Sequence, residues 1–158
     1  MKTILVVCTG NICRSPMAAA LLRARLEEDE ERRGWRVVSA GTWASFGRPA
    51  SAYAIAEMAE RGIDIQGHRS RSVNEQMMGR ADLALVMTES HTEALLAAFP
   101  DQAHKVYMLA QMSGHAYDIS DPYGGTRLEY SYIARELEQL IDAGYDRIVT
   151  LAEQVSED

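Results

Sequence analysis

A cysteine and an arginine near the start of the chain are spaced so that both side chains can face one bound anion. Cys8 follows a short apolar segment, five residues separate it from Arg14, and Ser15 and Pro16 come next. The backbone N–H groups between them can form a nest around an anion, and the N-terminus of the helix that Pro16 opens adds positive partial charge. The same field favours the nucleophilic thiolate of Cys8. A nucleophile and an anion cradle in one loop suit attack on phosphorus.

The residue types in this loop favour a functional interpretation over a structural one. By itself Cys8 would be a buried structural cysteine, which is common for this residue type. Arg14, however, offers a planar pair of donors that can hold two phosphoryl oxygens through the transition state. A cation in the first turn of a helix is unfavourable unless an anion compensates it, so the position of Arg14 itself indicates an anion site. We therefore predict these phosphate-binding residues: Thr9, Gly10, Asn11, Ile12, Cys13, Arg14 and Ser15.

An oxygen that leaves as a phenolate or alkoxide needs a proton, and the second half of the chain offers two carboxyl groups for this task. Asp121 stands directly before Pro122 and Tyr123, and Asp118 lies three residues earlier. Asp-Pro alone is only a turn signal. A thiolate working with a protonated carboxylic acid predicts a bell-shaped rate profile on the acid side of neutrality. Tyr123 would then form an aromatic wall for a flat leaving group.

The two motifs, in this order and spacing, resemble the low-molecular-weight protein tyrosine phosphatases. The resemblance rests on Cys-x5-Arg-Ser near the N-terminus and on Asp121-Pro122-Tyr123 more than a hundred residues later, and it covers nearly the whole chain. It implies a cysteinyl-phosphate intermediate on Cys8, assigns the acid role to Asp121, and makes Ser15 assist the sulfur as a leaving group. The loop-bracing residues that it implies are Asn11, Ser15, Ser39 and His68.

The family pattern also concerns the walls of the substrate pocket. We predict that Tyr123, Ile12 and Trp43 form these walls, with Phe46 as the alternative to Trp43. Members of the family from animals have a second aromatic residue directly after the tyrosine. This chain has Gly124-Gly125 there, which predicts a more open wall.

A second cysteine inside the loop predicts a redox response. Cys13 resembles the second cysteine that many family members carry, and under oxidation it would trap Cys8 as a disulfide before irreversible over-oxidation. The alternative for Cys13 is a small, packed side chain. No metal or other cofactor is expected, because Arg14, the backbone nest and the thiolate supply the electrostatic stabilisation that metals provide elsewhere. The remaining histidines at 91, 104 and 115 are scattered along the sequence.

Phosphotyrosine in proteins is the substrate that the loop favours, with inorganic phosphate as product. The segment from Asp118 to Gly125 resembles the bacterial branch that includes phosphoarginine phosphatases, so a protein phosphoarginine phosphatase is the alternative. In that branch a threonine typically stands where this chain has Ile12, and this difference favours phosphotyrosine. Arsenate reduction is a further alternative, because arsenate is also a tetrahedral oxyanion. Thioredoxin-coupled arsenate reductases need two further cysteines, and none follows Cys13, so this alternative would require a small external thiol. A binding module without turnover is disfavoured by the presence of nucleophile, clamp and acid together.

Composition restricts the class of protein. The chain has 158 residues with 47% hydrophobic and 25% charged residues, which predicts one soluble domain over residues 1–158. A net charge of −7 argues against general nucleic-acid binding. No apolar stretch approaches the ~20 residues of a membrane span. Two cysteines provide no disulfide framework, so we expect a cytoplasmic protein. As partners we expect phosphorylated protein or peptide substrates and no membrane, and we expect a monomer.

Strand-like and helix-like segments alternate, which predicts an α/β fold. We expect a four-stranded parallel sheet with helices on both faces and the Cys8 loop at the C-terminal end of the first strand. The expected strands are 1–7, 35–39, 82–87 and 105–109. The expected helices are 16–33, 50–61, one that Thr88 caps and that ends near 99–100, and 127–143 with a continuation past Gly144, besides a short turn that Asn74 caps. The acidic run 27–31 is expected on a solvated helix face.

Overall fold

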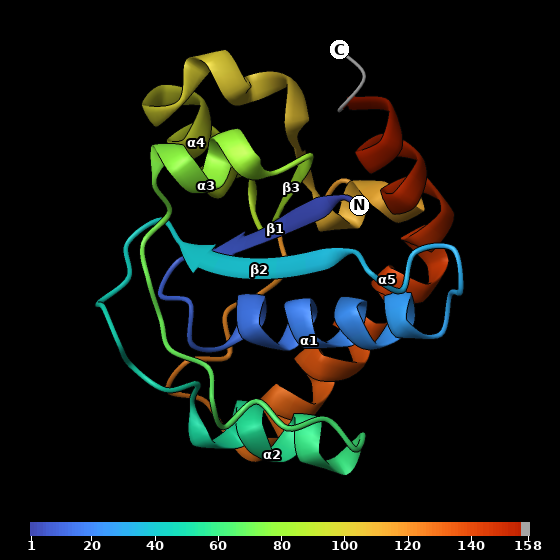
Figure 1. Ribbon diagram of the computed structural model, residues 1–158. Helices are drawn as coiled ribbons and strands as arrows, with labels where there is room; N and C mark the ends of the chain where they lie inside the picture. Colours follow the sequence, from blue (N-terminus) through green and yellow to red (C-terminus); the bar gives the residue numbers. More distant parts are fainter. Residues whose placement is uncertain (156–158) are drawn as a thin grey trace.

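A four-stranded parallel sheet forms the centre of the protein (Figure 1). The computed structural model describes residues 1–155. Its strands lie in the order β2-β1-β3-β4, and each pair is parallel. Their bounds are β1 Thr3–Cys8, β2 Arg36–Gly41, β3 Leu83–Val86 and β4 Val106–Met108. The predicted fold class is confirmed.

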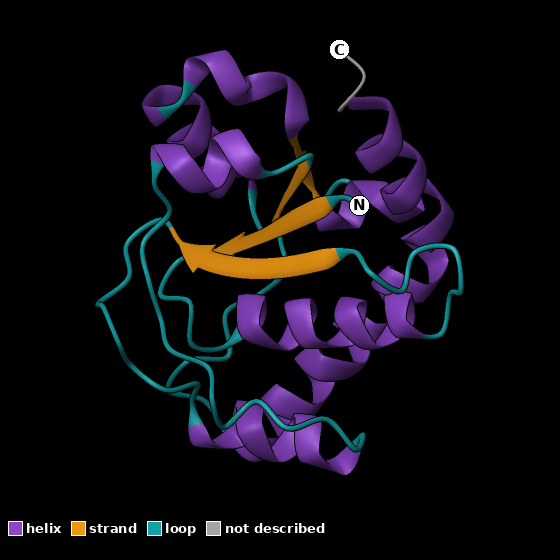
Figure 2. Cartoon of the chain, in the orientation of Figure 1, coloured by secondary structure: helices purple, strands orange, loops and turns teal. Residues whose placement is uncertain are grey.

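Helices cover both faces of the sheet, as Figure 2 shows. They are α1 Arg14–Glu27, α2 Ala52–Glu60, α3 Glu75–Arg80, α4 Glu89–Ala98 and α5 Arg127–Val155, with 3-10 segments η1 Pro100–Lys105 and η2 Leu109–Ser113. In Figure 1, α1, α2 and α5 lie on one side of the sheet, and α3 and α4 lie on the other. None of the helices within residues 1–155 combines the length and apolar character needed to cross a membrane.

Strand β1 is buried on both faces, because it lies between two strands and two layers of helices. Ile4 and Val6 pack into the core on the side of α1 and α5, whereas Leu5 and Val7 pack into the smaller core on the side of α3 and α4. A strand buried on both faces is expected to be a continuous apolar run rather than an alternating one. The register sets Cys8 beside Gly41 at the carboxyl edge of the sheet.

The ends of the helices follow their capping residues, with one correction. Asn74 and Thr88 cap α3 and α4 through side-chain oxygens that accept backbone N–H groups, as predicted. The predicted extension of helix 16–33 is wrong, because α1 ends at Glu27. The Asp29 carboxylate accepts the N–H of Glu31, the guanidinium of Arg32 and the hydroxyl of Tyr145. Such side-chain contacts compete with helical hydrogen bonds, and acidic residues are unfavourable at a helix C-terminus.

Residues 28–31 of the acidic run therefore form turns after α1 rather than a helix face, and Asp29 within them is half-buried. Helix α5 is the longest element and continues past Gly144, as predicted. A Cβ at Gly144 would approach the Cβ of Met112 to 2.6 Å, so the glycine lets α5 pass close to η2. The first residue of α5, Arg127, binds the buried Glu57 of α2 at 2.7 Å. This ion pair fixes the end of the segment that carries Asp121.

Candidate active site

The loop between β1 and α1 is held by hydrogen bonds that converge on one buried asparagine. Asn11 has a φ of 58°, the left-handed conformation that asparagine tolerates better than most residues. Its side-chain amide donates to Ser15 Oγ at 2.8 Å and to Ser39 Oγ at 3.0 Å. Its carbonyl accepts from His68 Nε2 at 2.7 Å, and its Oδ1 accepts from the backbone N–H of Arg71 at 3.1 Å. The four residues predicted to brace the loop therefore lie together, and Arg71 joins them.

Cys8 ends β1, and its buried thiol faces Ser15. Cys8 Sγ lies 2.9 Å from Ser15 Oγ. Because Ser15 Oγ already accepts a hydrogen bond from Asn11, its own proton is free to point at the sulfur. A Cβ at Gly41 would come within 2.2 Å of the Thr9 carbonyl oxygen, so only glycine allows β2 to pass this close to the loop.

The guanidinium of Arg14 is buried and only partly satisfied. Its Nη1 donates to the Ile119 carbonyl at 2.8 Å, and its Nη2 donates to Thr9 Oγ1 at 3.3 Å. The same Nη2 lies 3.5 Å from Asp121 Oδ2. Its Nε is buried and has no hydrogen-bond partner within residues 1–155. A buried donor of a charged group without a partner is costly, and it indicates a place for an anion.

A cavity of about 200 Å³ brings most of the predicted site residues together. Larger hollows, of about 620, 560 and 440 Å³, lie elsewhere on the surface and contain neither cysteine. The smaller cavity has a size that suits a phosphoryl group with part of its substituent. Its lining residues are Cys8, Thr9, Gly10, Ile12, Cys13, Arg14, Arg48, Asp121 and Tyr123.

The structure separates the two candidate carboxyl groups. Asp121 lies on the cavity, with its side chain 48% exposed, and its Oδ1 accepts the backbone N–H of Tyr123 at 3.0 Å. Asp118 instead accepts the backbone N–H of Glu89 at 2.9 Å and so lies at the start of α4. Only Asp121 therefore lies beside both the cysteine and the arginine of the loop.

Two of the predicted wall residues lie at the cavity and one does not. Ile12 and Tyr123 line it, and Tyr123 is 60% exposed at its rim. Trp43 is 85% exposed and Phe46 is 91% exposed, and neither residue lines the cavity. The structure therefore does not bring Trp43 together with the other predicted wall residues.

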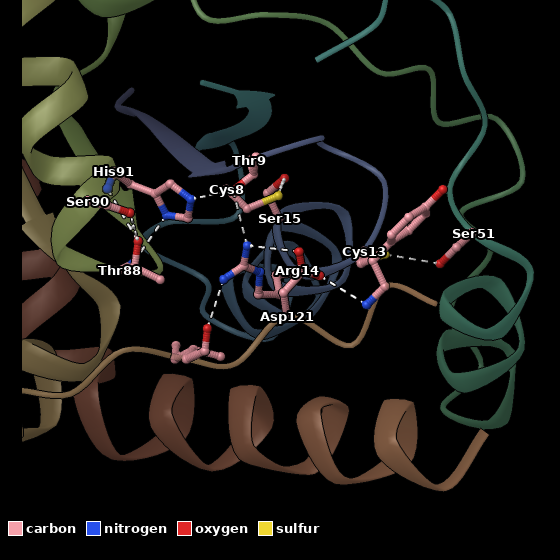
Figure 3. A network of polar contacts seen from close by, with 12 residues as sticks. Cys8, Thr9, Cys13, Arg14, Ser15, Ser51, Thr88, Ser90, His91 and Asp121 are labelled. Carbon is pink, nitrogen blue, oxygen red and sulfur yellow. Dashed lines mark hydrogen bonds and ion pairs between the residues drawn. The ribbon is translucent and has the colours of Figure 1, made fainter. Parts of the chain in front are cut away.

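Cys13 is buried beside Cys8 in the loop, and both thiols are free. Cys13 Sγ lies 3.1 Å from the hydroxyl of Tyr130 and 3.5 Å from Ser51 Oγ (Figure 3). Burial raises the pKa of Cys13, and the hydrogen bonds from Ser51 and Tyr130 oppose this effect. Burial, followed by the contact with Cys13, raises the pKa of Tyr130 to about 12. The Cys13 thiol is thus held as a neutral, packed group.

Sequence reasoning missed His91, which enters the site from α4 (Figure 3). Its Nε2 lies 2.8 Å from Thr9 Oγ1, and it is 3% exposed. The run Thr88-Glu89-Ser90-His91 carried a usable signal, because the third residue after an N-cap often completes a capping box. Its place after a strand that neighbours β1 would bring it near the loop. Within residues 1–155, no group of three or more His, Cys, Asp or Glu side chains is placed to hold a metal ion.

Two cationic residues of the site were also missed. Arg48 is exposed and lines the cavity. The backbone N–H of Arg71 donates to Asn11 Oδ1, and the Nε of Arg71 donates to the Ser39 carbonyl at 3.2 Å. Burial lowers the pKa of His68 despite its bond to the Asn11 carbonyl. Nothing in the local sequence around these arginines distinguishes them from other surface arginines.

Comparisons with known proteins agree with this geometry. The family model for low molecular weight phosphotyrosine protein phosphatase matches residues 3–157. A probable low molecular weight protein-tyrosine-phosphatase, EpsP of Ralstonia solanacearum, is 40% identical over 151 residues, which cover 96% of this chain and 99% of that protein. A protein-arginine-phosphatase of Geobacillus stearothermophilus is 40% identical over 148 residues, which cover 93% of this chain and 96% of that protein.

Solved structures lead to the same family. The low molecular weight protein tyrosine phosphatase from T. tengcongensis matches with a TM-score of 0.87 and 38% identity, over 93% of this chain and 99% of that one. The YwlE arginine phosphatase from Geobacillus stearothermophilus matches with a TM-score of 0.85 and 39% identity, over 100% of this chain and 98% of that one. The resemblance inferred from the motifs and the enzyme class that it implied, a phosphomonoester hydrolase, are confirmed. The chain belongs to the low molecular weight phosphotyrosine protein phosphatase family.

Proposed function

We propose that this protein hydrolyses phosphotyrosine in phosphoproteins through a cysteinyl-phosphate on Cys8. The observation that carries the proposal is the buried, unpartnered Nε of Arg14, whose guanidinium lines the same cavity as the thiol. Nη1 donates to the Ile119 carbonyl and Nη2 donates to Thr9, so Nε remains available to a phosphoryl oxygen. A bound phosphoryl group would satisfy the donor that the protein itself leaves unpaired.

In the first step the Cys8 thiolate attacks phosphorus and a sulfur–phosphorus bond forms. The bond from phosphorus to the tyrosine oxygen breaks, and Asp121 gives its proton to that oxygen. Arg14 and the backbone N–H groups of the loop hold the equatorial oxygens as negative charge develops on them. The Ser15 hydroxyl lies 2.9 Å from the sulfur and can donate a hydrogen bond to it.

In the second step water attacks the phosphorus of the cysteinyl-phosphate. Asp121, now ionised, takes a proton from the water, and the sulfur–phosphorus bond breaks. The Ser15 hydroxyl stabilises the departing thiolate, and inorganic phosphate leaves. The side chain of Asp121 is 48% exposed, so it can exchange its proton with solvent between turnovers.

The lining of the cavity supports phosphotyrosine over phosphoarginine. Ile12 and Tyr123 offer apolar and aromatic surface for a flat ring. Arg14 and Arg48 are its basic residues and Asp121 is its one acidic residue, a balance that is unfavourable for the cationic guanidinium of phosphoarginine. The phosphoarginine alternative is supported by the named arginine phosphatases among the relatives. Phosphorylated protein is the substrate class in either case.

The deciding experiment compares kcat/KM for a phosphotyrosine peptide and a phosphoarginine peptide of the same sequence at slightly acid pH. Cys8→Ser is the blank, and Ile12→Thr is the matched variant at the position that separates the two substrates. We expect a phosphotyrosine preference that narrows in Ile12→Thr. A phosphoarginine preference in the unaltered protein would overturn the substrate. Activity on neither, together with turnover of arsenate and an external thiol, would overturn the function.

A further inference from the structure

His91 is the third residue after the N-cap of α4, and its ring connects that helix to the phosphate loop. Its Nδ1 accepts the backbone N–H of Thr88 at 3.1 Å, which completes a capping box. A neutral imidazole has one proton, so a ring that accepts at Nδ1 carries its proton on Nε2. Nε2 lies 2.8 Å from Thr9 Oγ1. The cap of α4 therefore fixes the tautomer, and His91 donates to Thr9.

Thr9 Oγ1 receives a second hydrogen bond from the other side. Arg14 Nη2 donates to it at 3.3 Å. A hydroxyl oxygen has two lone pairs and one proton, and here both lone pairs have a donor. The proton must then occupy the remaining direction around the oxygen. Thr9 lines the cavity and is exposed, so this direction is open to a bound ligand.

We infer that His91 is a positioning residue, which uses Thr9 to aim a hydroxyl donor at the phosphoryl group and to hold the Arg14 guanidinium beside it. This inference rests on the proposed function, because it adds a donor to the same oxyanion site. Thr9 would touch the substrate, and His91 would act only through Thr9. The backbone nest and Arg14 then have a third, side-chain donor beside them.

The surroundings of His91 keep its ring neutral. Burial, with the charge of Arg14 adding to it, lowers the pKa of His91 to about 4, although Asp118 and Asp121 act in the opposite direction. At slightly acid pH the ring therefore stays in one tautomer. A second ring proton would face the backbone N–H of Thr88 and break the capping box. The donor direction is thus set by the fold rather than by the pH of the assay.

Nitrogen NMR of the unaltered protein tests the tautomer without any turnover. We expect His91 to show the Nε2–H tautomer, with no titration between neutral pH and about pH 5. The Nδ1–H tautomer, or protonation near the ordinary histidine pKa, would overturn the inference. Thr9→Val should shift the Nε2 signal of His91 and leave its Nδ1 signal in place.

A double-mutant cycle tests the action through Thr9. His91→Gln keeps the cap, because glutamine at this position accepts the N-cap N–H, but it removes the ring that reaches Thr9. Thr9→Val removes the hydroxyl at constant shape. We expect Thr9→Val to lower kcat/KM about 10- to 100-fold, the range for one hydrogen bond to a charged group. His91→Gln should lower kcat/KM about tenfold, and the same substitution should have no further effect on kcat/KM in the Thr9→Val background.

Thr88→Ala is the matched structural control. It removes the hydroxyl that caps the N–H of His91, but it leaves the backbone N–H that fixes Nδ1. It should therefore lower the melting temperature about as much as, or more than, His91→Gln and leave kcat/KM within about twofold. Equal losses of kcat/KM in Thr88→Ala and His91→Gln would show a merely structural role and overturn the inference.

The Kd of inorganic phosphate separates this inference from the proposed function. Thr9→Val and His91→Gln should both weaken phosphate binding in the Cys8→Ser background, where no turnover occurs. Failure of the unaltered protein to hydrolyse either phosphopeptide would overturn the function, and the ratios of phosphate Kd would still decide the role of His91. Unchanged Kd values in both variants would overturn the inference even in an active enzyme.

Discussion

The two halves of the candidate site are built in opposite ways. The phosphate loop is interlocked and buried, with exposed fractions of 2% for Cys8, 0% for Asn11 and 4% for Arg14. The side chains of Asp121 and Tyr123 are exposed, and their segment is held locally by two short turns, in which Asp121 Oδ1 accepts the N–H of Tyr123 and the Pro122 carbonyl accepts the N–H of Gly125. Oxyanion stabilisation requires donors that are fixed before the reaction, whereas a proton donor must meet solvent and an incoming leaving group. The difference in burial therefore matches a difference in task.

Arg14 is the residue that connects the two halves. Its guanidinium donates to Thr9 in the loop and to Ile119 just before the acid segment, and it lies 3.5 Å from Asp121 Oδ2. The fixed half thus contacts the exposed half through this side chain. Variants in each half should accordingly affect different kinetic quantities.

The largest expected effect concerns the nucleophile of the fixed half. Cys8→Ser should lower kcat by at least about 10⁴-fold, because a serine hydroxyl is a far weaker nucleophile than a thiolate. Since the nest and Arg14 are unchanged, the Kd of inorganic phosphate should stay within a few-fold. Titration calorimetry with phosphate measures this, and loss of binding would mean that the sulfur itself holds the loop in place.

The next effect concerns the exposed half. Asp121→Asn should slow hydrolysis of a phenyl phosphate about 100-fold, the size typical of a lost general acid. The loss should shrink when the leaving group is already acidic, because that oxygen needs no proton. Rates for a series of aryl phosphates check this.

Asp118→Asn is the matched control for Asp121→Asn, since this carboxylate lies at the start of α4 and outside the cavity. It should keep the leaving-group dependence of the unaltered protein. Equal losses for all leaving groups in Asp121→Asn would remove Asp121 from the acid role.

A third effect concerns stability rather than rate. His91 has a pKa lowered to about 4 by burial, so the unfolded chain takes up its proton at a higher pH than the folded one. The stability from the neutral ring is present above its ordinary pKa of about 6.5 and is lost as pH falls toward 4, by about 3 kcal/mol in all. His68, whose pKa is also lowered, acts with the same sign.

Urea unfolding at several pH values measures how the free energy of unfolding depends on pH. His91→Gln should flatten this pH dependence between about pH 6.5 and pH 4. A slope that is the same in the unaltered protein and in His91→Gln would contradict the neutral, buried ring.

The smallest effect concerns the second thiol of the fixed half. Mild peroxide should oxidise Cys8 to a sulfenic acid, which Cys13 then attacks to form a disulfide with loss of water. The Cys13 thiol must first leave its contact with Tyr130, so Tyr130→Phe should accelerate the reaction a few-fold. Intact-mass analysis should show the loss of two hydrogens, and a stable sulfinic acid on Cys8 would count against the trap.

The sequence allowed prediction of those features that depend on neighbours along the chain. The spacing of Cys8 and Arg14 and the caps at Asn74 and Thr88 depend on a few adjacent residues, and the structure agrees with them. The alternation of strands and helices was enough for the fold, because parallel strands require helical crossovers.

The missed features depend on residues that are distant along the chain. His91 reaches Thr9 across 82 residues, and this requires knowing that β3 lies beside β1. The turns after Glu27, where α1 ends, contain Asp29, whose carboxylate accepts the hydroxyl of Tyr145 from 116 residues further along the chain. Neither pairing has a periodic pattern that could predict it.

The hydrogen bond from Arg14 to the Ile119 carbonyl also has a consequence for when the site can form during synthesis. The nucleophile loop is translated before its supports at Ser39, His68 and Ile119, which leave the ribosome one after another. The site is therefore completed only when the last of these supports has emerged, as expected for contacts of long sequence separation. We expect nascent chains stalled before Ile119 to leave Cys8 open to an alkylating reagent, and protection at that stage would show that the loop closes without its anchor.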